Sequence, residues 1–214
     1  MLEGKNVNLR IVEKEDLPLI VEWFNKPEIF GEYNPLIQMS RTEIEKDYGE
    51  KKLEQTEFFI EGKDGSRIGY IWHFNVMHPA GKILEIGYFL VPSERGKGYC
   101  TEATQLMVDY LFLSKNIERI QAQTDVRNVG SQKVLEKAGF RKEGIIRKVF
   151  FLRGQLRDAC LYRILREEWK EPSARTRTIW FCGIGGLQCT SPLFQKLLRR
   201  TLPLCEHQHK VCRI

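Results

Sequence analysis

The chain has 214 residues and a formal net charge of +6, with 42% hydrophobic and 29% charged residues. This length suits one ordinary domain with its own hydrophobic core, and no apolar run approaches the roughly 20 residues that span a bilayer. The start, M-L-E-G-K-N-V-N-L-R, lacks the apolar stretch and the cleavage site of a secretion signal. We therefore expect a cytoplasmic protein that does not enter a membrane.

The basic excess is confined to the C-terminal segment. Residues 173–214 contain seven Lys or Arg residues and one acid, Glu206, so the preceding residues are neutral as a whole. A neutral domain argues against nucleic acid as its partner. We expect one domain over residues 1–171 and a basic, cysteine-rich extension over residues 172–214 that lies outside the domain fold.

The extension leaves two alternatives open. Its four cysteines and two histidines suggest a zinc site, but no pair has the C-x-x-C spacing, so we expect no metal. A short basic amphipathic helix near Leu193–Leu198 is the other alternative, with a membrane or a nucleic acid as its partner. The two cysteines of the domain, Cys100 and Cys160, suggest reduced thiols in the cytosol.

The first half of the chain predicts a strand, two helices and three further strands. Residues 6–12 alternate as a half-buried strand does. Asp16 is the predicted cap of a helix that ends near Pro27; an irregular stretch follows over residues 28–39. Ser40 and Glu43 form a capping box for a polar helix that runs to about Leu53. Residues 58–61 and 67–74 predict a hairpin, and residues 83–91 predict a strand that Pro92 ends.

The second half adds a helix, a strand, another helix and a second hairpin. Apolar residues after Gly98 recur at helical spacing, and residues 119–124 predict a strand. Asn128 caps the next helix, which Gly139 ends. Residues 149–152 and 157–165 flank a turn. Antiparallel hairpins combined with one β-α-β passage predict an α+β fold with a mixed sheet rather than a doubly wound parallel sheet.

The stretch V-P-S-E-R-G-K-G-Y-C-T-E-A, residues 91–103, joins a predicted strand to a predicted helix. It is no Walker loop, because Gly98 is followed by Tyr99 and no Ser or Thr hydroxyl is placed to hold magnesium. It is no dinucleotide fingerprint, because Thr101 stands where a third glycine is needed. Amides at a helix N-terminus favour an anion, and glycine lets the backbone approach it closely. With Arg95 and Lys97 beside it, the turn predicts a diphosphate site; a plain turn with solvated charges is the alternative.

A second motif begins at Asn128, just after the next predicted strand. Together, R-G-K-G-Y-x-T-E-A and N-x-x-S-x-x-x-x-E-K-x-G-F resemble the two acetyl-CoA motifs of the GNAT N-acetyltransferases, most closely the branch with the RimJ/RimL-type ribosomal-protein and polyamine acetyltransferases. The resemblance covers roughly residues 2–168, including a late F-x-x-x-G-x-x-x-D pattern from Phe150 to Asp158. It implies a mostly antiparallel sheet with splayed central strands, and acetyl transfer from acetyl-CoA to a primary amine.

The resemblance also implies which residues bind acetyl-CoA. Backbone groups of Phe89 and Val91 would receive the pantetheine arm between the splayed strands, where Gly87 is compatible with a bulge or a close approach. The glycine turn would bind the diphosphate, and Asn128 would bond the arm besides capping its helix. The implied set is Phe89, Leu90, Val91, Arg95, Gly96, Lys97, Gly98, Tyr99, Cys100, Asn128, Ser131 and Lys137.

Acetyl transfer requires a neutral amine, a polarised thioester carbonyl and a leaving thiolate. A backbone amide at Phe89 or its neighbour would hold the developing oxyanion. Glu85 is the predicted base, because it lies opposite the apolar row of its strand and is expected to face a cleft; a solvated carboxylate or a salt bridge is the alternative. Where many family members carry a tyrosine acid, this chain has Leu135. Ser131 is therefore the predicted donor to the thiolate, unless the thiolate leaves unassisted.

The acceptor amine is the least constrained part of the prediction. Glu32, Tyr33 and Trp72 are the predicted substrate-binding residues, with His73 nearby; Glu32 and Glu85 suit a cationic amine. Both a protein N-terminus and a small-molecule amine such as a polyamine stay open as acceptors, and so does a homodimer. A non-catalytic acyl-CoA-binding sensor with the same fold is the alternative function.

Overall fold

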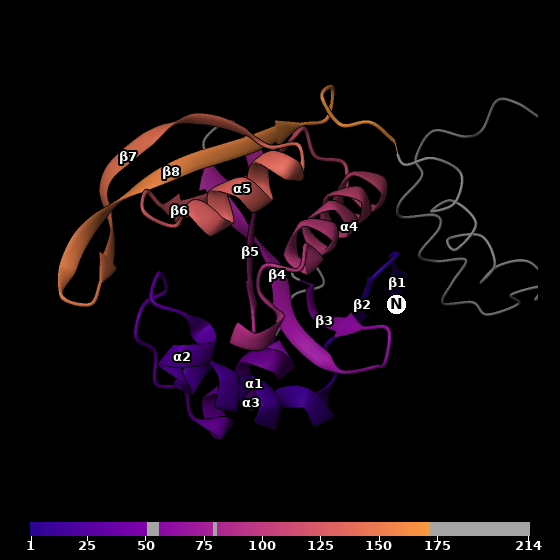
Figure 1. Cartoon of the computed structure of the whole chain (residues 1–214), viewed down its shortest axis with the longest axis vertical. Coiled ribbons are helices and arrows are strands. Elements are labelled where there is room, and N and C mark those ends of the chain that lie inside the picture. Colours follow the sequence, from indigo (N-terminus) through magenta and orange to yellow (C-terminus); the bar gives the residue numbers. More distant parts are fainter. Residues whose placement is uncertain (51–55, 79–80, 172–214) are drawn as a thin grey trace, which may run out of the picture.

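The computed structural model describes residues 1–50, 56–78 and 81–171. Eight strands form one sheet in the order β1-β2-β3-β4-β5-β6-β8-β7, with helices packed against it (Figure 1). Neighbouring strands are antiparallel except β5 and β6, which are parallel. The predicted α+β fold with a mixed, mostly antiparallel sheet is therefore confirmed.

The elements have the following bounds. The strands are β1 (Leu2–Glu3), β2 (Val7–Ile11), β3 (Glu57–Gly62), β4 (Arg67–His78), β5 (Gly81–Leu90), β6 (Arg119–Asp125), β7 (Arg141–Leu152) and β8 (Gln155–Leu165). The helices are α1 (Leu17–Asn25), α2 (Pro27–Phe30), α3 (Arg41–Glu50), α4 (Tyr99–Ser114) and α5 (Val129–Lys137), with short 3-10 turns at Lys14–Asp16 and Pro92–Glu94.

Three local predictions can be compared with these bounds. The capping box is confirmed, since the Ser40 N–H donates to Glu43 Oε2 at 2.9 Å and the Glu43 N–H donates to Ser40 Oγ at 3.1 Å. The predicted end of that helix near Leu53 lies outside the described residues. Asp16 stands at the predicted N-cap position of α1, but its side chain makes no capping hydrogen bond, because its carboxylate accepts hydrogen bonds from Arg10 and Arg67.

Several elements are missing from the prediction or shorter in it, among them β1, which was not predicted. The stretch over residues 28–39, predicted to be irregular, begins inside the short helix α2. Strand β7 starts at Arg141, eight residues before the predicted start. Most of its side chains are exposed, so backbone pairing with β8 holds the strand in place. Its sequence therefore shows little alternation of apolar and polar residues from which the strand could be predicted.

The sheet separates two hydrophobic clusters. One cluster packs α4 and α5 against the sheet and includes Leu84, Ile86 and Leu90 of β5. The other packs α1 and α2 against the opposite face and includes Phe89, also of β5. Successive residues of β5 therefore face different helix layers, and this alternation assigns every side chain of the strand to one side of the molecule.

The two central strands diverge, as the resemblance implied. The register of β5 with β6 contains only the pairs Leu84–Ile120 and Glu85–Gln121, whereas β5 pairs with β4 along its whole length. Beyond Glu85 no pair joins β5 to β6, and we call this unpaired edge of β5 the gap. Helix α5, which follows β6 along the chain, lies next to α4 (Figure 1). An open strand edge inside a sheet offers backbone groups to a ligand.

Candidate active site

The ladder between β4 and β5 determines which backbone groups face the gap. The Val91 N–H donates to the Ile68 carbonyl at 2.9 Å, and the Val91 carbonyl accepts from the Glu94 N–H at 3.0 Å. Hydrogen-bonded and non-hydrogen-bonded pairs alternate in an antiparallel ladder, so the backbone of Phe89 also points toward β4. The backbone groups directed into the gap are those of Tyr88 and Leu90, one residue away from the pair that we predicted, Phe89 and Val91.

The turn after β5 has the backbone geometry expected of an anion site. Gly96 and Gly98 have φ values of +80° and +86°, and a Cβ built on either meets no atom within 4 Å. Gly98 is the N-cap of α4, and the N–H groups of Thr101 and Glu102 both donate to its carbonyl. The N–H groups before Thr101, those of Gly98, Tyr99 and Cys100, have no acceptor within the helix, so they are free to bind an anion at the positive end of the helix dipole.

The two cationic side chains of this turn have partners within the chain. The Arg95 guanidinium donates to the carbonyls of Leu90 (3.1 Å) and Ile29 (3.0 Å), so it ties α2 to the end of β5. Lys97 pairs with Glu94 at 3.1 Å and is half exposed. Burial raises the pKa of the Cys100 thiol to about 12, so only its backbone suits an anion. The backbone of the turn is therefore its principal anion-binding element.

Glu85 was predicted to be exposed to a cleft, but in the structure its side chain is nearly buried. Its exposed fraction is only 9%, and its Oε2 accepts hydrogen bonds from Gln121 Nε2 at 2.8 Å and from Gln123 Nε2 at 3.0 Å. Gln121 is oriented by Arg119, which donates to the other end of its amide at 3.3 Å. The carboxylate lies beside the point where β5 and β6 separate, with Oε1 accepting no hydrogen bond from the described residues.

Ser131 lies in the first turn of α5, on the opposite face of the sheet from Glu85. Its N–H donates to Asn128 Oδ1 at 3.0 Å, which confirms Asn128 as the helix cap. Its hydroxyl lies 3.0 Å from the hydroxyl of Tyr88. Leu135 is fully buried in the core and occupies the place where a helical tyrosine was considered. The tyrosine at this end of the gap thus comes from β5 and not from α5.

Gly87 explains how Trp72 reaches the same region. The two residues are cross-strand partners on β4 and β5, and a Cβ on Gly87 would lie 2.3 Å from Trp72 Cζ2. The close approach expected at Gly87 is therefore made by an indole ring within the chain, without a bulge between β4 and β5. Trp72 also packs near Tyr70 and Phe89. His73, whose side chain points to the other face of β4, is 1% exposed and lies away from Trp72.

The loop that carries Glu32 and Tyr33 meets the turn after β6. Arg127 Cζ lies 5.9 Å from the centroid of the Tyr33 ring, and Arg127 Nε donates to Asp125 at 3.1 Å. Burial and the neighbouring Glu32 carboxylate raise the pKa of Tyr33. Although burial opposes it, hydrogen bonds from Arg127 lower the pKa of Asp125. Glu32 and Tyr33, which were predicted to bind the acceptor amine, therefore lie near the segment that leads into Asn128.

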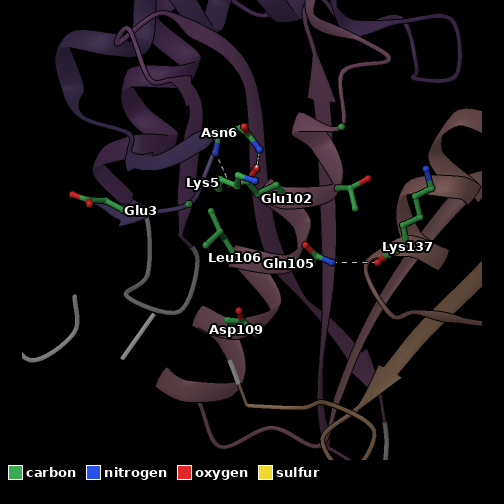
Figure 2. Close-up of a pocket in the computed structure, with 11 residues that line it drawn as sticks. Glu3, Lys5, Asn6, Glu102, Gln105, Leu106, Asp109 and Lys137 are labelled. Atoms are coloured by element: carbon green, nitrogen blue, oxygen red, sulfur yellow. Dashed lines mark hydrogen bonds between the residues drawn. The ribbon is translucent and has the colours of Figure 1, made fainter. Parts of the chain in front are cut away.

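A pocket of about 850 Å³ extends from the glycine turn along α4. Figure 2 shows Glu102 and Gln105 of α4 between the β1–β2 segment and Lys137 at the end of α5. Gln105 Nε2 donates to the backbone carbonyl of Lys137 at 3.2 Å. The Lys137 side chain takes no part in this bond and lines the pocket. Because Gly98 also lines this pocket, the turn and Lys137 border one continuous depression.

The sequence reasoning missed four residues of this region: Tyr88, Gln121, Gln123 and Arg127. Tyr88 belongs to the apolar row of its strand opposite Glu85, and a buried tyrosine hydroxyl that needs a partner is a signal in itself. Gln121 and Gln123 alternate on one face of β6, which marks a polar site inside a sheet. Arg127 carried no signal, because its contact with Tyr33 depends on two segments distant in sequence.

Two negative observations apply to the described residues. They contain no group of three or more His, Cys, Asp or Glu side chains arranged to hold a metal ion. Among their helices, none combines the length and the apolar character of a membrane span. The cysteines and histidines of the extension lie outside these ranges.

Comparisons with known proteins agree with this geometry. The profile of the acetyltransferase (GNAT) domain matches residues 6–141. The chain is 35% identical over 178 residues to the probable N-acetyltransferase YjcK of Bacillus subtilis, covering 78% of this chain and 98% of that protein. It is 26% identical over 180 residues to spermidine N(1)-acetyltransferase of Escherichia coli, covering 79% and 91%.

A solved structure shares both the fold and part of the sequence. RimJ of Mycobacterium smegmatis in complex with CoA-disulfide superimposes with a TM-score of 0.68 and 27% identity, over 81% of this chain and 88% of that one. The profile match, the relatives and the divergence of β5 from β6 support the same assignment. The chain belongs to the GNAT family of N-acetyltransferases.

Proposed function

We propose that this protein transfers the acetyl group of acetyl-CoA to a primary amine by direct attack within a ternary complex. The observation that carries the proposal is the gap between β5 and β6, which begins at the Glu85–Gln121 pair and ends at the glycine turn. The gap offers the backbone of Tyr88 and Leu90 to an extended arm, and the turn offers its amides to a diphosphate at one end of that arm.

The residues present fit acetyl-CoA at each position of this path. The turn over residues 95–100 would bind the diphosphate, mainly through backbone N–H groups, and Lys137 would lie near the nucleotide end in the adjoining pocket. Asn128 and Ser131 border the gap at the start of α5. Acetyl-CoA supplies an acetyl thioester, whose carbonyl a gap-facing amide of Tyr88 or Leu90 would polarise.

Glu85 and Ser131 border the gap from opposite faces of the sheet. Glu85 Oε1, which accepts no hydrogen bond from the described residues, is the atom to accept a proton from the amine, directly or through water. The hydroxyl of Ser131 lies on the other side, where the thiolate leaves. In this arrangement the amine enters from the α1–α2 face and the thiol departs on the α4–α5 face.

The acceptor would enter beside Trp72, Glu32 and Tyr33. Exposed Glu32 and buried Glu85 favour a cationic amine, and the indole of Trp72 offers a face to such a cation. Relatives of this chain include a spermidine acetyltransferase and a RimJ structure. Both a polyamine and a protein N-terminus are therefore acceptors to test.

A thiol-release assay with acetyl-CoA tests the proposal. The panel of amines contains polyamines, peptides with free N-termini and aminoglycosides, with the same compounds acetylated on nitrogen as controls. Release that requires a free amine and produces its N-acetyl derivative by mass spectrometry is the expected result. Tight acetyl-CoA binding without release for any amine would instead indicate a sensor of acyl-CoA.

A further inference from the structure

The hydroxyl groups of Tyr88 and Ser131 form a link across the gap. They lie 3.0 Å apart, with Tyr88 on β5 and Ser131 on α5. Beyond the Glu85–Gln121 pair, this contact connects β5 to the segment that follows β6 on the α4–α5 side of the sheet. Tyr88 and Glu85 are three residues apart on one strand, so their side chains point to opposite faces.

We propose that Tyr88 is a positioning residue for Ser131: its O–H donates to Ser131 Oγ, which leaves the Ser131 O–H to donate to the sulfur of the departing thiolate. The inference rests on the acetyl transfer proposed above and assigns a residue to its leaving-group side. It also explains why Leu135 is compatible with that reaction, because Ser131, held in place by Tyr88, supplies the hydroxyl while Leu135 packs the core.

Geometry supports this direction of donation. A hydroxyl has one hydrogen and two acceptor sites. If Ser131 donated to Tyr88, the Tyr88 hydrogen would be left with the Ser131 carbonyl at 3.4 Å, which is long for an O–H donor. If Tyr88 donates to Ser131 Oγ, the bond is 3.0 Å and the Ser131 hydrogen stays available.

Tyr88 acts through a hydrogen bond and not by giving up its proton. Burial raises the pKa of the Tyr88 phenol well above its usual value, so the phenol stays protonated at neutral pH. An ordinary thiol has a pKa of about 8.5, so a thiolate is too weak a base to deprotonate such a phenol. A buried phenol that keeps its proton is a constant donor to Ser131.

The step balances without a proton from either hydroxyl. The bond between the amine nitrogen and the acetyl carbon forms, the bond between that carbon and sulfur breaks, and its electron pair stays on sulfur. The amine proton goes to Glu85 or to water. The Ser131 O–H stabilises the charge that develops on sulfur, and hydrogen bonds to a charged group are the stronger kind.

Kinetics of three variants test the assignment. Tyr88→Phe keeps the ring and removes the hydroxyl; we expect kcat to fall up to about tenfold, the scale of one hydrogen bond between neutral groups, with the KM for acetyl-CoA unchanged. Ser131→Ala should fall as far or further, and the double variant no further than Ser131→Ala. Tyr110→Phe, which removes a hydroxyl near Thr56, is the matched control and should keep the parent rate. Additive losses in the double variant would overturn the assignment.

A binding measurement separates this inference from the proposed function. Coenzyme A and desulfo-coenzyme A, which lacks the sulfur, are titrated calorimetrically at a pH where the thiol ionises. The parent should prefer coenzyme A, and both Tyr88→Phe and Ser131→Ala should abolish the preference while still binding desulfo-coenzyme A. If Tyr88→Phe keeps the preference of the parent while Ser131→Ala loses it, the role of Tyr88 alone is overturned; if both variants keep it, the role of Ser131 is overturned as well. Failure of the parent to bind either compound overturns the proposed function, and the role of Tyr88 with it.

Discussion

At the scale of single residues, a substitution of Glu85 distinguishes the proposed enzyme from a non-catalytic sensor of acyl-CoA. Glu85→Gln keeps an oxygen that can accept the hydrogen bonds from Gln121 and Gln123, but it places an amide where the base should be. The rate should fall about 10²–10³-fold, the scale of losing a general base, while acetyl-CoA still binds. Raising the pH should restore part of the rate, because more of the amine is neutral.

The control for this variant is Glu118→Gln, an exposed carboxylate just before β6, which should behave as the parent. Steady-state rates and acetyl-CoA affinity are the measurements. A Glu85→Gln variant as fast as the parent between about pH 6 and 9 would remove Glu85 from proton transfer. Glu32 would then be the next residue to test.

Gly98 is the second residue whose role a single substitution decides. With φ at +86° and open space around its Cβ position, Gly98→Val both strains the turn and places a branched side chain at the proposed diphosphate site. We expect the acetyl-CoA dissociation constant to rise at least about tenfold, or roughly 1.4 kcal/mol. Isothermal titration provides the measurement.

Gly65 provides a matched control for backbone strain. It has a φ of +81° and equally open surroundings, but it lies in the turn between β3 and β4. Gly65→Val should therefore lower stability to a similar extent without changing acetyl-CoA affinity. If both variants weakened binding equally, or if Gly98→Val bound normally, the turn would not be the diphosphate site.

At the scale of elements, the pairing of β4 with β5 depends on the absence of a side chain at Gly87. Gly87→Ala would bring a methyl group within 2.3 Å of the Trp72 ring, so the indole must move. We expect a loss of about 1–3 kcal/mol in the free energy of unfolding and a higher KM for the amine, with acetyl-CoA affinity unchanged. Unchanged amine KM in the folded variant would show that Trp72 does not contact the acceptor.

The hydrogen bond between Thr56, just before β3, and His73 of β4 predicts that the stability of the fold depends on pH. His73 is 1% exposed, its Nε2 accepts from the Thr56 N–H at 3.1 Å, and burial, reinforced by nearby Lys115, lowers its pKa to about 4. In the unfolded chain the pKa is about 6.5. As the pH falls from about 6.5 toward 4, the unfolded chain binds a proton that the fold excludes, so stability decreases, by about 3 kcal/mol in the limit.

Thermal unfolding between neutral pH and about pH 4.5 measures this effect. His73→Gln keeps an acceptor for the Thr56 N–H and cannot titrate in this range. Its unfolding temperature should therefore fall less steeply with decreasing pH than that of the parent. Parallel curves for parent and variant would place the acid sensitivity elsewhere.

At the scale of the whole molecule, the boundary after residue 171 is the feature to test. Near it, Trp169 packs on Phe112 at 5.4 Å between ring centroids and donates through Nε1 to Asp109 at 2.7 Å. The match to YjcK likewise covers 78% of this chain but 98% of that relative. We propose that residues 1–171 form the complete catalytic domain.

Removal of residues 172–214 should therefore leave kcat, the KM for acetyl-CoA and the unfolding temperature unchanged. Trp169→Ala in the shortened chain is the control, and it should lower the unfolding temperature because it removes the contacts with Phe112 and Asp109. Loss of activity on shortening alone would move the boundary of the domain into the extension.

The sequence by itself determined the features that depend on neighbours along the chain. The cap at Asn128 and the capping box of Ser40 and Glu43 agree with the structure. Each results from interactions within about four residues. Apart from β1 and α2, the order of strands and helices, with one parallel passage, followed from the same local patterns.

Only the tertiary structure decided what lies opposite each side chain. The burial of Glu85 against Gln121 and Gln123, the hydrogen bond from Arg95 to Ile29 and the meeting of Tyr88 with Ser131 join segments at least 36 residues apart. Alternation along a strand assigns a side chain to one face, but it carries no information on which segments cover that face. Those partners depend on where β5 and β6 diverge and how the helices pack over the two faces, and these determine the chemistry of the site.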